Sequence, residues 1–145
     1  MKNNKGFSLV ELIVVIAIMA ILAAVAIPTF ASFIDKANTA TDVDFINNAE
    51  YAAELAYTAD PSKEVDYVTV TLGEKGAVSK VTVNFVQPAT GTIDAVEVDA
   101  GDKTDSDAAK STIANTIDWD YKFKSEKTGT FRINTENTKE LKEVQ

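Results

Sequence analysis

The chain has 145 residues, a net charge of −8, and neither cysteine nor histidine. A chain of this length fits one modest domain, and the absence of cysteine excludes a disulfide-stapled scaffold. Thiol nucleophiles, histidine triads and nearly all zinc or copper sites are excluded as well. The acidic balance argues against broad nucleic-acid binding through phosphate neutralisation, although it leaves room for a local basic patch.

Much of the apolar composition is concentrated in one run from Phe7 to Ile27, whose only polar side chains are Ser8 and Glu11. As a helix, this run spans roughly 30 Å, the thickness of a bilayer's hydrocarbon core. Lys2 and Lys5 precede it. The positive-inside rule therefore predicts a cytoplasmic N-terminus and an outer location for the rest of the chain.

Two ordinary interpretations fit this run in part. A secretory signal peptide would use Ala24-Val25-Ala26 as its small-residue cleavage site, but the run is longer than the roughly 7 to 15 apolar residues usual in such peptides. It also carries a carboxylate that disfavours insertion into lipid. An uncleaved signal anchor explains the length and the orientation, but it gives Glu11 no role.

The residues around the start of the run support a third interpretation. Lys5-Gly6-Phe7-Ser8-Leu9-Val10-Glu11 resembles the processing motif of type IV prepilins and the related pseudopilins. It has a short basic leader ending in Gly, then Phe, a hydroxyl residue, two aliphatics and Glu. An apolar stretch follows, and Pro28 has an aromatic residue two positions later. The resemblance is close from Lys5 to about Lys36.

The resemblance implies an α+β pilin fold, in which a long N-terminal helix has two halves. The hydrophobic half lies in the membrane or the filament core, and the amphipathic half packs on a small antiparallel β-sheet. It further implies three segments: a prepilin leader peptide at residues 1–6, a transmembrane and filament-core helix at 7–28, and a globular head at 29–145 that includes the second half of the helix.

The resemblance also implies a processing site and an assembly residue. A prepilin peptidase would cut between Gly6 and Phe7, and the new amino group of Phe7 would be methylated. Glu11 would then attract the Phe7 amine of a neighbouring subunit as the helices bundle. The alternative for Glu11 is an ordinary helix-start acid, because a carboxylate near a helix N-terminus is favoured by the helix dipole.

The function implied by the resemblance is that of a structural subunit of a type IV pilus. The subunit would be stored in the cytoplasmic membrane and polymerised with itself into an extracellular filament at the cell surface. Further implied partners are an inner-membrane platform protein, a cytoplasmic assembly ATPase and minor pilins. Adhesion, twitching motility and DNA uptake all stay open. The alternatives are a type II secretion or competence pseudopilin and, in another class, a membrane-anchored extracellular binding domain.

Beyond the apolar run, the sequence predicts a continuing helix. Pro28 removes a backbone donor, which predicts a kink or a local opening there. Apolar and small residues then recur at spacings of three and four, with charged residues such as Asp42 between them. One stripe is therefore expected to pack on a sheet, and the charged residues are expected to face water or neighbouring molecules. The members of the stripe are Phe30, Phe33, Ile34, Ala37, Thr41, Phe45, Ala49, Ala52 and Ala56. Asp60-Pro61 predicts the end of the helix near Thr58.

Alternating residues predict the sheet. Two strands containing Val68 to Leu72 and Val81 to Phe85 flank a Gly-Glu-Lys-Gly connection and form a hairpin. A break at 87–91 precedes a third strand from Ile93 to Val98, and Ser106 to Ile117 has the spacing of a short helix. A last pair of strands is predicted around Thr128-Gly129, from Trp119-x-Tyr121-x-Phe123 and Phe131-x-Ile133.

Two features of the outer part have competing interpretations. The aromatic row Trp119, Tyr121 and Phe123 could bind sugars or bases, but period-two aromatics usually pack a sheet against its core, which we favour. The acidic loop Asp99, Asp102, Asp105 and Asp107 could hold calcium, as related secretion pseudopilins do. Its spacing misses the EF-hand pattern, and a solvated loop that caps the next helix is favoured.

No catalytic or cofactor-binding residue is predicted. A pair of carboxylates could in principle act as acid and base, but nothing places two of them beside a pocket-forming motif. No Gly-rich phosphate loop follows a strand. The sequence therefore predicts a non-enzyme.

Overall fold

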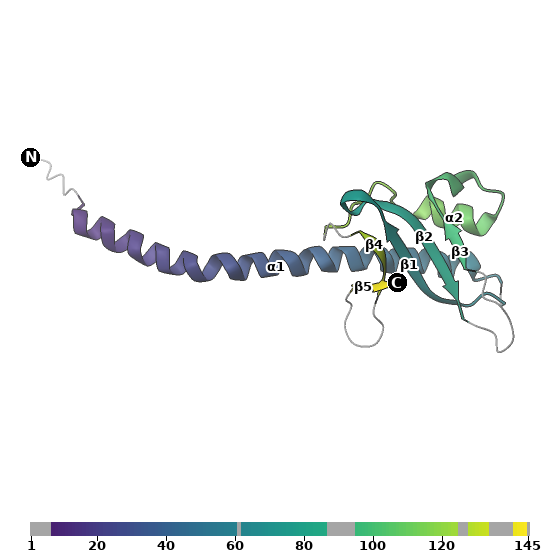
Figure 1. Ribbon diagram of the computed structural model, residues 1–145, viewed down its shortest axis with the longest axis horizontal. Helices are drawn as coiled ribbons and strands as arrows, with labels where there is room; N and C mark the ends of the chain where they lie inside the picture. Colours follow the sequence, from purple (N-terminus) through teal and green to yellow (C-terminus); the bar gives the residue numbers. More distant parts are fainter. Residues whose placement is uncertain (1–6, 61, 87–94, 125–127, 134–140, 145) are drawn as a thin grey trace, which may run out of the picture. The chain divides into compact units, whose positions relative to one another are not determined.

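A long helix and a five-stranded sheet make up most of the chain (Figure 1). The computed structural model describes residues 7–60, 62–86, 95–124, 128–133 and 141–144. The chain divides into two compact units, residues 1–36 and 37–145. Helix α1 (Leu9–Tyr57) has 49 residues, beginning in the first unit and ending in the second. The predicted long helix, with its end near Thr58, is therefore confirmed.

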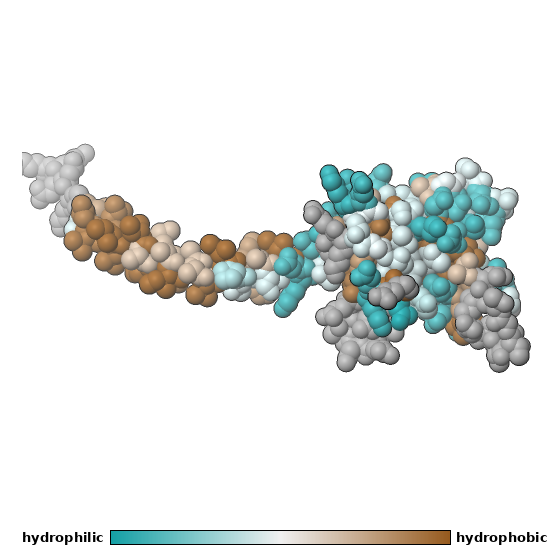
Figure 2. Space-filling view, viewed as in Figure 1, coloured by the Kyte–Doolittle hydropathy of each residue, from teal (hydrophilic) through white to brown (hydrophobic). Residues whose placement is uncertain are grey.

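In the first unit, α1 is apolar and uncovered. Every described residue from Phe7 to Lys36 is exposed. By length and composition α1 is able to cross a membrane, and none of its most apolar window is buried. The apolar colour of this stretch is evident in Figure 2. Leu, Ile, Val, Met and Ala without a helix-breaking residue before Pro28 account for the unbroken helix.

Pro28 lies inside α1, and the helix is continuous on both sides of it. Proline has no N–H group, so the helix lacks one backbone hydrogen bond at this position. The hydroxyl of the next residue, Thr29, donates to the carbonyl oxygen of Val25 at 2.9 Å. The kink expected at Pro28 stays a prediction.

The second unit is built on one antiparallel sheet with the strand order β3-β2-β1-β4-β5. The hairpin of β1 and β2 forms its centre, with Val70 opposite Val81, as the alternating pattern predicts. The bounds are β1 (Val65–Leu72), β2 (Val78–Phe85), β3 (Val96–Val98), β4 (Gly129–Ile133) and β5 (Leu141–Val144). The predicted α+β class is thereby confirmed.

The core of this unit lies between the second half of α1 and the inner face of the sheet. Val68, Val70, Val81 and Val83 are completely buried on alternate positions of β1 and β2. The buried residues of α1 are Asp42, Val43, Phe45, Ile46, Ala49, Ala52, Ala53 and Tyr57. Ala49 and Ala53 belong to the same core cluster as these strand residues. Of the predicted stripe, Phe45, Ala49 and Ala52 are buried, whereas Thr41 is exposed.

A short helix, α2 (Ala108–Thr116), confirms the helix predicted from Ser106 to Ile117, although it is shorter than predicted at both ends. Asp107 is its N-cap, because its carboxylate accepts the N–H groups of Ala109 and Lys110. Capping by an aspartate satisfies backbone donors that a helix start otherwise leaves without partners. Ile113 is completely buried and joins α2 to the core.

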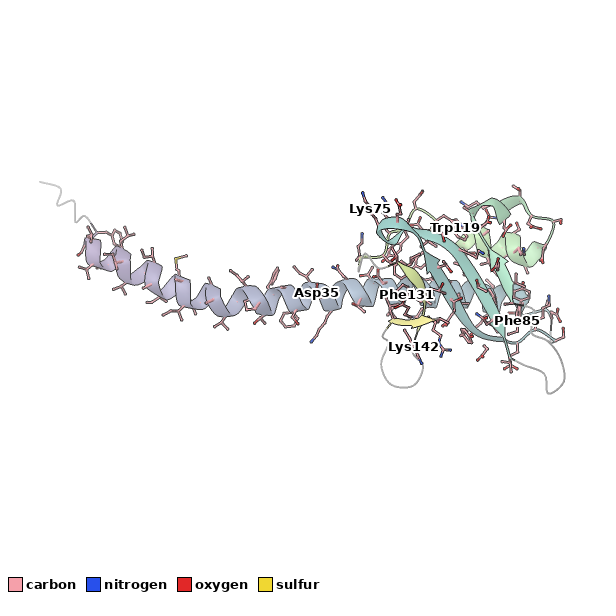
Figure 3. The ribbon with its side chains drawn as sticks, viewed as in Figure 1. Asp35, Lys75, Phe85, Trp119, Phe131 and Lys142 are labelled. Carbon is pink, nitrogen blue, oxygen red and sulfur yellow. The ribbon has the colours of Figure 1, made fainter. Side chains whose placement is uncertain are left out.

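The prediction of a strand from Trp119 to Phe123 is wrong. Only Lys122 makes a sheet contact there, an isolated bridge to Ala77. Strand β4 instead pairs with β1 and with β5. The period-two aromatics do not indicate a strand. They pack on the core, since Phe123 is buried and Trp119 (labelled in Figure 3) and Tyr121 lie partly buried against it.

Two edges of the sheet differ from the expectation. Strand β3 is described from Val96 to Val98, whereas the predicted start at Ile93 and the break at 87–91 lie outside the described residues. Strand β5 (Leu141–Val144) was not expected, because its charged residues hide any alternation. It pairs with β4 from Thr130 opposite Val144 to Ile133 opposite Leu141.

Candidate functional site

The first turn of α1 is closed by a capping box. The backbone N–H of Ser8 donates to Oε2 of Glu11 at 2.9 Å, and the Ser8 hydroxyl oxygen accepts the N–H of Val10 at 3.3 Å. The N–H of Leu12 donates to the Ser8 carbonyl oxygen at 3.2 Å and begins the helical ladder. Two otherwise unpartnered donors are thus satisfied by the pattern Ser-x-x-Glu.

Glu11 therefore has a definite contact within its own chain. A carboxylate in the first turn is also favoured by the positive end of the helix dipole. This contact supports the interpretation of Glu11 as a helix-start acid. It leaves the docking role open, because a carboxylate can accept several hydrogen bonds at once.

The predicted processing site lies just before this turn. Phe7 is 92% exposed and directly precedes Ser8. Gly6 and the rest of the leader, residues 1–6, lie outside the described residues. Cleavage before Phe7 would remove none of the atoms of the capping box, because the Ser8 N–H belongs to the peptide bond that joins Phe7 to Ser8.

A continuous apolar surface follows the capping box along α1. Its large side chains are between about half and three-quarters exposed, for example Leu12 at 62% and Ile27 at 69%. The others are Leu9, Val10, Ile13, Val14, Val15, Ile16, Ile18, Met19, Ile21, Leu22, Val25, Phe30, Phe33 and Ile34. Exposed apolar surface on this scale marks a membrane or protein interaction site.

Asp42, in the second unit, has a structural role that the sequence did not predict. It was expected to face water or neighbours, but its side chain is completely buried. Its Oδ1 accepts the hydroxyl of Tyr121 at 3.0 Å and the backbone N–H of Lys124 at 2.8 Å. A buried carboxylate needs such donors, because its desolvation costs several kcal/mol. Asp42 thereby ties α1 to a segment some eighty residues later.

Aromatic rings surround this contact. The rings of Phe45 and Tyr121 stack with centroids 4.7 Å apart, and Phe123 meets both rings edge to face at 5.5 and 5.6 Å. Burial, and next the hydrogen bond to Asp42, raises the pKa of Tyr121 far above its ordinary value. The aromatic row therefore serves the core, as predicted, and Tyr121 adds a polar link to α1.

The acidic loop uses its carboxylates on its own backbone. Asp99 accepts the N–H of Gly101 and Asp102 accepts the N–H of Asp99, which closes the short 3₁₀ turn Ala100–Thr104. Asp105 accepts the N–H of Asp107, and Asp107 caps α2. Among the residues that the structure describes, no group of three or more acidic side chains is arranged to hold a metal ion. The capping role expected of this loop is confirmed.

Residues 1–27 match the family model described as the prokaryotic N-terminal methylation motif. The match covers the leader, the capping box and the whole apolar run before Pro28. Comparisons of the chain with curated proteins and with solved structures give no significant match.

Proposed function

We propose that this chain, which belongs to the type IV pilin and pseudopilin family by its methylation motif, long N-terminal helix and antiparallel sheet, is a structural subunit of a type IV pilus. The observation that carries the proposal is the apolar surface of α1, whose described residues from Phe7 to Lys36 are all exposed. An isolated subunit cannot leave this surface in water, because apolar area costs roughly 25 cal/mol per Å².

Two environments cover such a helix in succession. Before assembly, residues 7–28 would lie in the cytoplasmic membrane, since a helix of this length spans roughly 30 Å of hydrocarbon. After assembly, the same residues would lie against copies of themselves in the filament core. Part of this surface carries only small side chains, which let neighbouring helix backbones approach closely. These residues are Ala17, Ala20, Ala23 and Ala24. The head, residues 29–145, would then form the outer surface of the filament.

Glu11 and the mature amino group of Phe7 would set the register of the bundle. Apolar helices gain little by leaving lipid for one another, so packing and paired charges must direct their association. Losing one partner of a buried charge pair costs about 3 to 5 kcal/mol, so a misplaced subunit would be rejected.

The methylation motif implies processing by a prepilin peptidase, with cleavage between Gly6 and Phe7 as the proposed position. The other proposed partners are an inner-membrane platform protein, an assembly ATPase and minor pilins. A secretion or competence pseudopilin carries the same motif and helix, and the family as a whole includes both kinds of subunit. The long surface filament is what separates a pilus subunit from a pseudopilin, so the first tests concern processing and assembly.

Processing is tested by the mass of the mature N-terminus. The protein isolated from cell-surface material is expected to begin at Phe7 with one methyl group on its amine. A chain beginning at Ile27 would instead indicate ordinary secretion after Ala26. Retention of residues 1–6 would indicate an uncleaved signal anchor.

Assembly is tested with Glu11→Val in the native host. Membrane insertion is expected to be unchanged or improved, because a carboxylate is unfavourable in lipid. The yield of sheared filaments is expected to fall to a few per cent or less, and Glu11→Asp is expected to be intermediate because its shorter side chain keeps the charge. A normal filament yield from Glu11→Val at equal subunit level would refute the pairing.

A further inference from the structure

The face of the sheet that points away from α1 is polar, whereas the opposite face forms the core. Along β1 and β2 the buried valines alternate with residues such as Thr69 and Thr82, which lie opposite each other in the ladder. On the same face, the hydroxyls of Thr71 and Thr130 lie 3.1 Å apart across β1 and β4. Hydroxyl groups therefore follow the middle strands of this surface, which we call the outer face of the sheet.

The charge of the outer face is opposite in sign to that of the whole chain. Among the residues paired in the strand ladders, the charged side chains of this face are Lys80, Glu97, Arg132 and Lys142. Lys80 forms an ion pair with Glu97, with Nζ and Oε2 2.7 Å apart. The other two are both cations, in a chain whose net charge is −8. A local basic patch thus lies on β4 and β5.

The two cations of this patch are cross-strand partners. Arg132 lies directly opposite Lys142 in the ladder of β4 and β5, and Lys142 is labelled in Figure 3. Side chains paired in this way have Cβ atoms roughly 4.5 to 5.5 Å apart, and like charges at this separation destabilise a sheet. Neither cation forms a salt bridge with a carboxylate in the part of the chain that the structure describes. A bound oxyanion would offset their repulsion.

The Arg132 guanidinium is held in place by Tyr67. Its Cζ lies 4.7 Å from the centre of the Tyr67 ring, so the cation is stacked on the aromatic face. A stacked guanidinium keeps N–H groups at its edge, and their planar fork matches the two oxygens of a carboxylate. Arg132 is half-buried and Lys142 is exposed, so both are open to a ligand that lies on the sheet.

We propose that the outer face of the sheet binds an acidic polysaccharide through Arg132 and Lys142. The guanidinium fork receives the carboxylate of a uronic acid unit, and the Lys142 ammonium is the second cation beside it. The threonine hydroxyls of the same face donate to and accept from the sugar hydroxyls.

Two observations favour a polysaccharide over a nucleic acid. The chain is acidic overall, and it repels the dense phosphate charge of a nucleic acid more strongly than the sparser charge of a uronic acid polymer. The Tyr67 ring is stacked with Arg132 instead of lying open to a base.

This inference goes beyond the proposed filament function, because every residue of the patch belongs to one chain. It adds a ligand class to the head. In the proposed filament the head repeats along the outer surface, so many weak sites would hold one polymer with high avidity.

The test measures the affinity of the full chain in detergent micelles for immobilised polygalacturonate by biolayer interferometry. Fully methyl-esterified polygalacturonate is the matched ligand, since it has the same backbone without the charges. The wild type is expected to bind the acid form about tenfold more tightly than the ester. Arg132→Gln is expected to weaken binding about tenfold and Lys142→Gln about threefold, and Arg132→Lys should be intermediate because it keeps the charge but loses the fork.

Two further variants separate the patch from general charge. Lys103→Gln removes the same charge from an exposed lysine of the 3₁₀ turn, outside the outer face, and should change affinity less than about twofold. Glu97→Gln should strengthen binding about twofold, because it removes the carboxylate paired with Lys80. A gain of affinity cannot arise from misfolding.

Several results would overturn the proposal. These are equal affinity for the polymer and its ester, an affinity that Arg132→Gln leaves unchanged, and equal losses from Arg132→Gln and Lys103→Gln. Double-stranded DNA is the competing probe. Tighter binding of DNA than of polygalacturonate, with the same dependence on Arg132, would assign the patch to nucleic acid instead. None of these results depends on filament formation, so they leave the proposed function to its own tests.

Discussion

Replacing Asp42 with alanine should unfold the second unit more easily, because its carboxylate is the buried acceptor of two donors. The Tyr121 hydroxyl and the Lys124 N–H reach the same Oδ1 at 3.0 and 2.8 Å. Each hydrogen bond to a charged group contributes about 1.5 to 3 kcal/mol. Relief of the buried charge offsets part of this sum. We therefore expect the free energy of unfolding to fall by about 2 to 4 kcal/mol.

The assay is urea unfolding of the full chain in detergent micelles, followed by the fluorescence of Trp119. This is the single tryptophan of the chain, and it packs against the core with its indole N–H donating to the Ala114 carbonyl oxygen at 2.8 Å. Tyr121→Phe keeps the ring stacked on Phe45 and removes one donor, so about 1 to 3 kcal/mol should be lost.

The matched control is Asp44→Ala, which removes an exposed carboxylate two residues along the same helix. It should change the free energy of unfolding by less than about 0.5 kcal/mol. The double variant Asp42→Ala with Tyr121→Phe should lose less than the sum of the single variants, because both remove the same bond. A loss below about 0.5 kcal/mol for Asp42→Ala would refute the anchoring role.

Three further predictions concern the second unit. Gly76→Ala should destabilise it by about 1 to 3 kcal/mol in the same urea assay, because Gly76 has φ +72° and an added Cβ would lie 2.8 Å from the Phe123 carbonyl oxygen. Gly73→Ala, whose Cβ would meet its nearest atom at 3.8 Å, should change stability by less than about 1 kcal/mol. Burial raises the pKa of the Glu50 carboxyl above 4.5, so the folded state binds the carboxyl proton more tightly than the unfolded state, and the free energy of unfolding should fall as pH rises from 4.5 through the raised pKa. Glu50→Gln should remove this pH dependence of stability, and an unchanged pH dependence would show that Glu50 is not its source. Residues 29–145 should fold alone in water and unfold cooperatively by circular dichroism, and a non-cooperative transition would refute an autonomous head.

Local patterns predicted the helix and the central hairpin because each pattern reports one face of one element. The uninterrupted apolar run and the spacing of three and four fix α1, and strict alternation fixes β1 and β2. The same logic failed at Trp119 to Phe123. Alternate aromatics there pack on α1 and the core, and a single bridge at Lys122 takes the place of a strand.

The functional residues also fall into two groups, those that a local sequence pattern predicts and those that it does not. Gly6, Phe7 and Glu11 were identified from a contiguous motif, which sequence displays directly. The capping box that joins Ser8 to Glu11 is also local, but it was not predicted, although its Ser-x-x-Glu spacing is a known sign of one. Asp42 was missed because an aspartate on a helix is normally exposed. Its burial depends on donors 79 and 82 residues away, which no local pattern reports.

Immunogold electron microscopy of the native host tests the central claim most directly, with an antibody raised against the second unit. The proposed function predicts thin surface filaments labelled along their whole length, and their loss in Glu11→Val cells that hold the same amount of membrane-bound subunit. Label confined to the cell envelope, in wild-type cells that carry the processed chain but no labelled filaments, would contradict it.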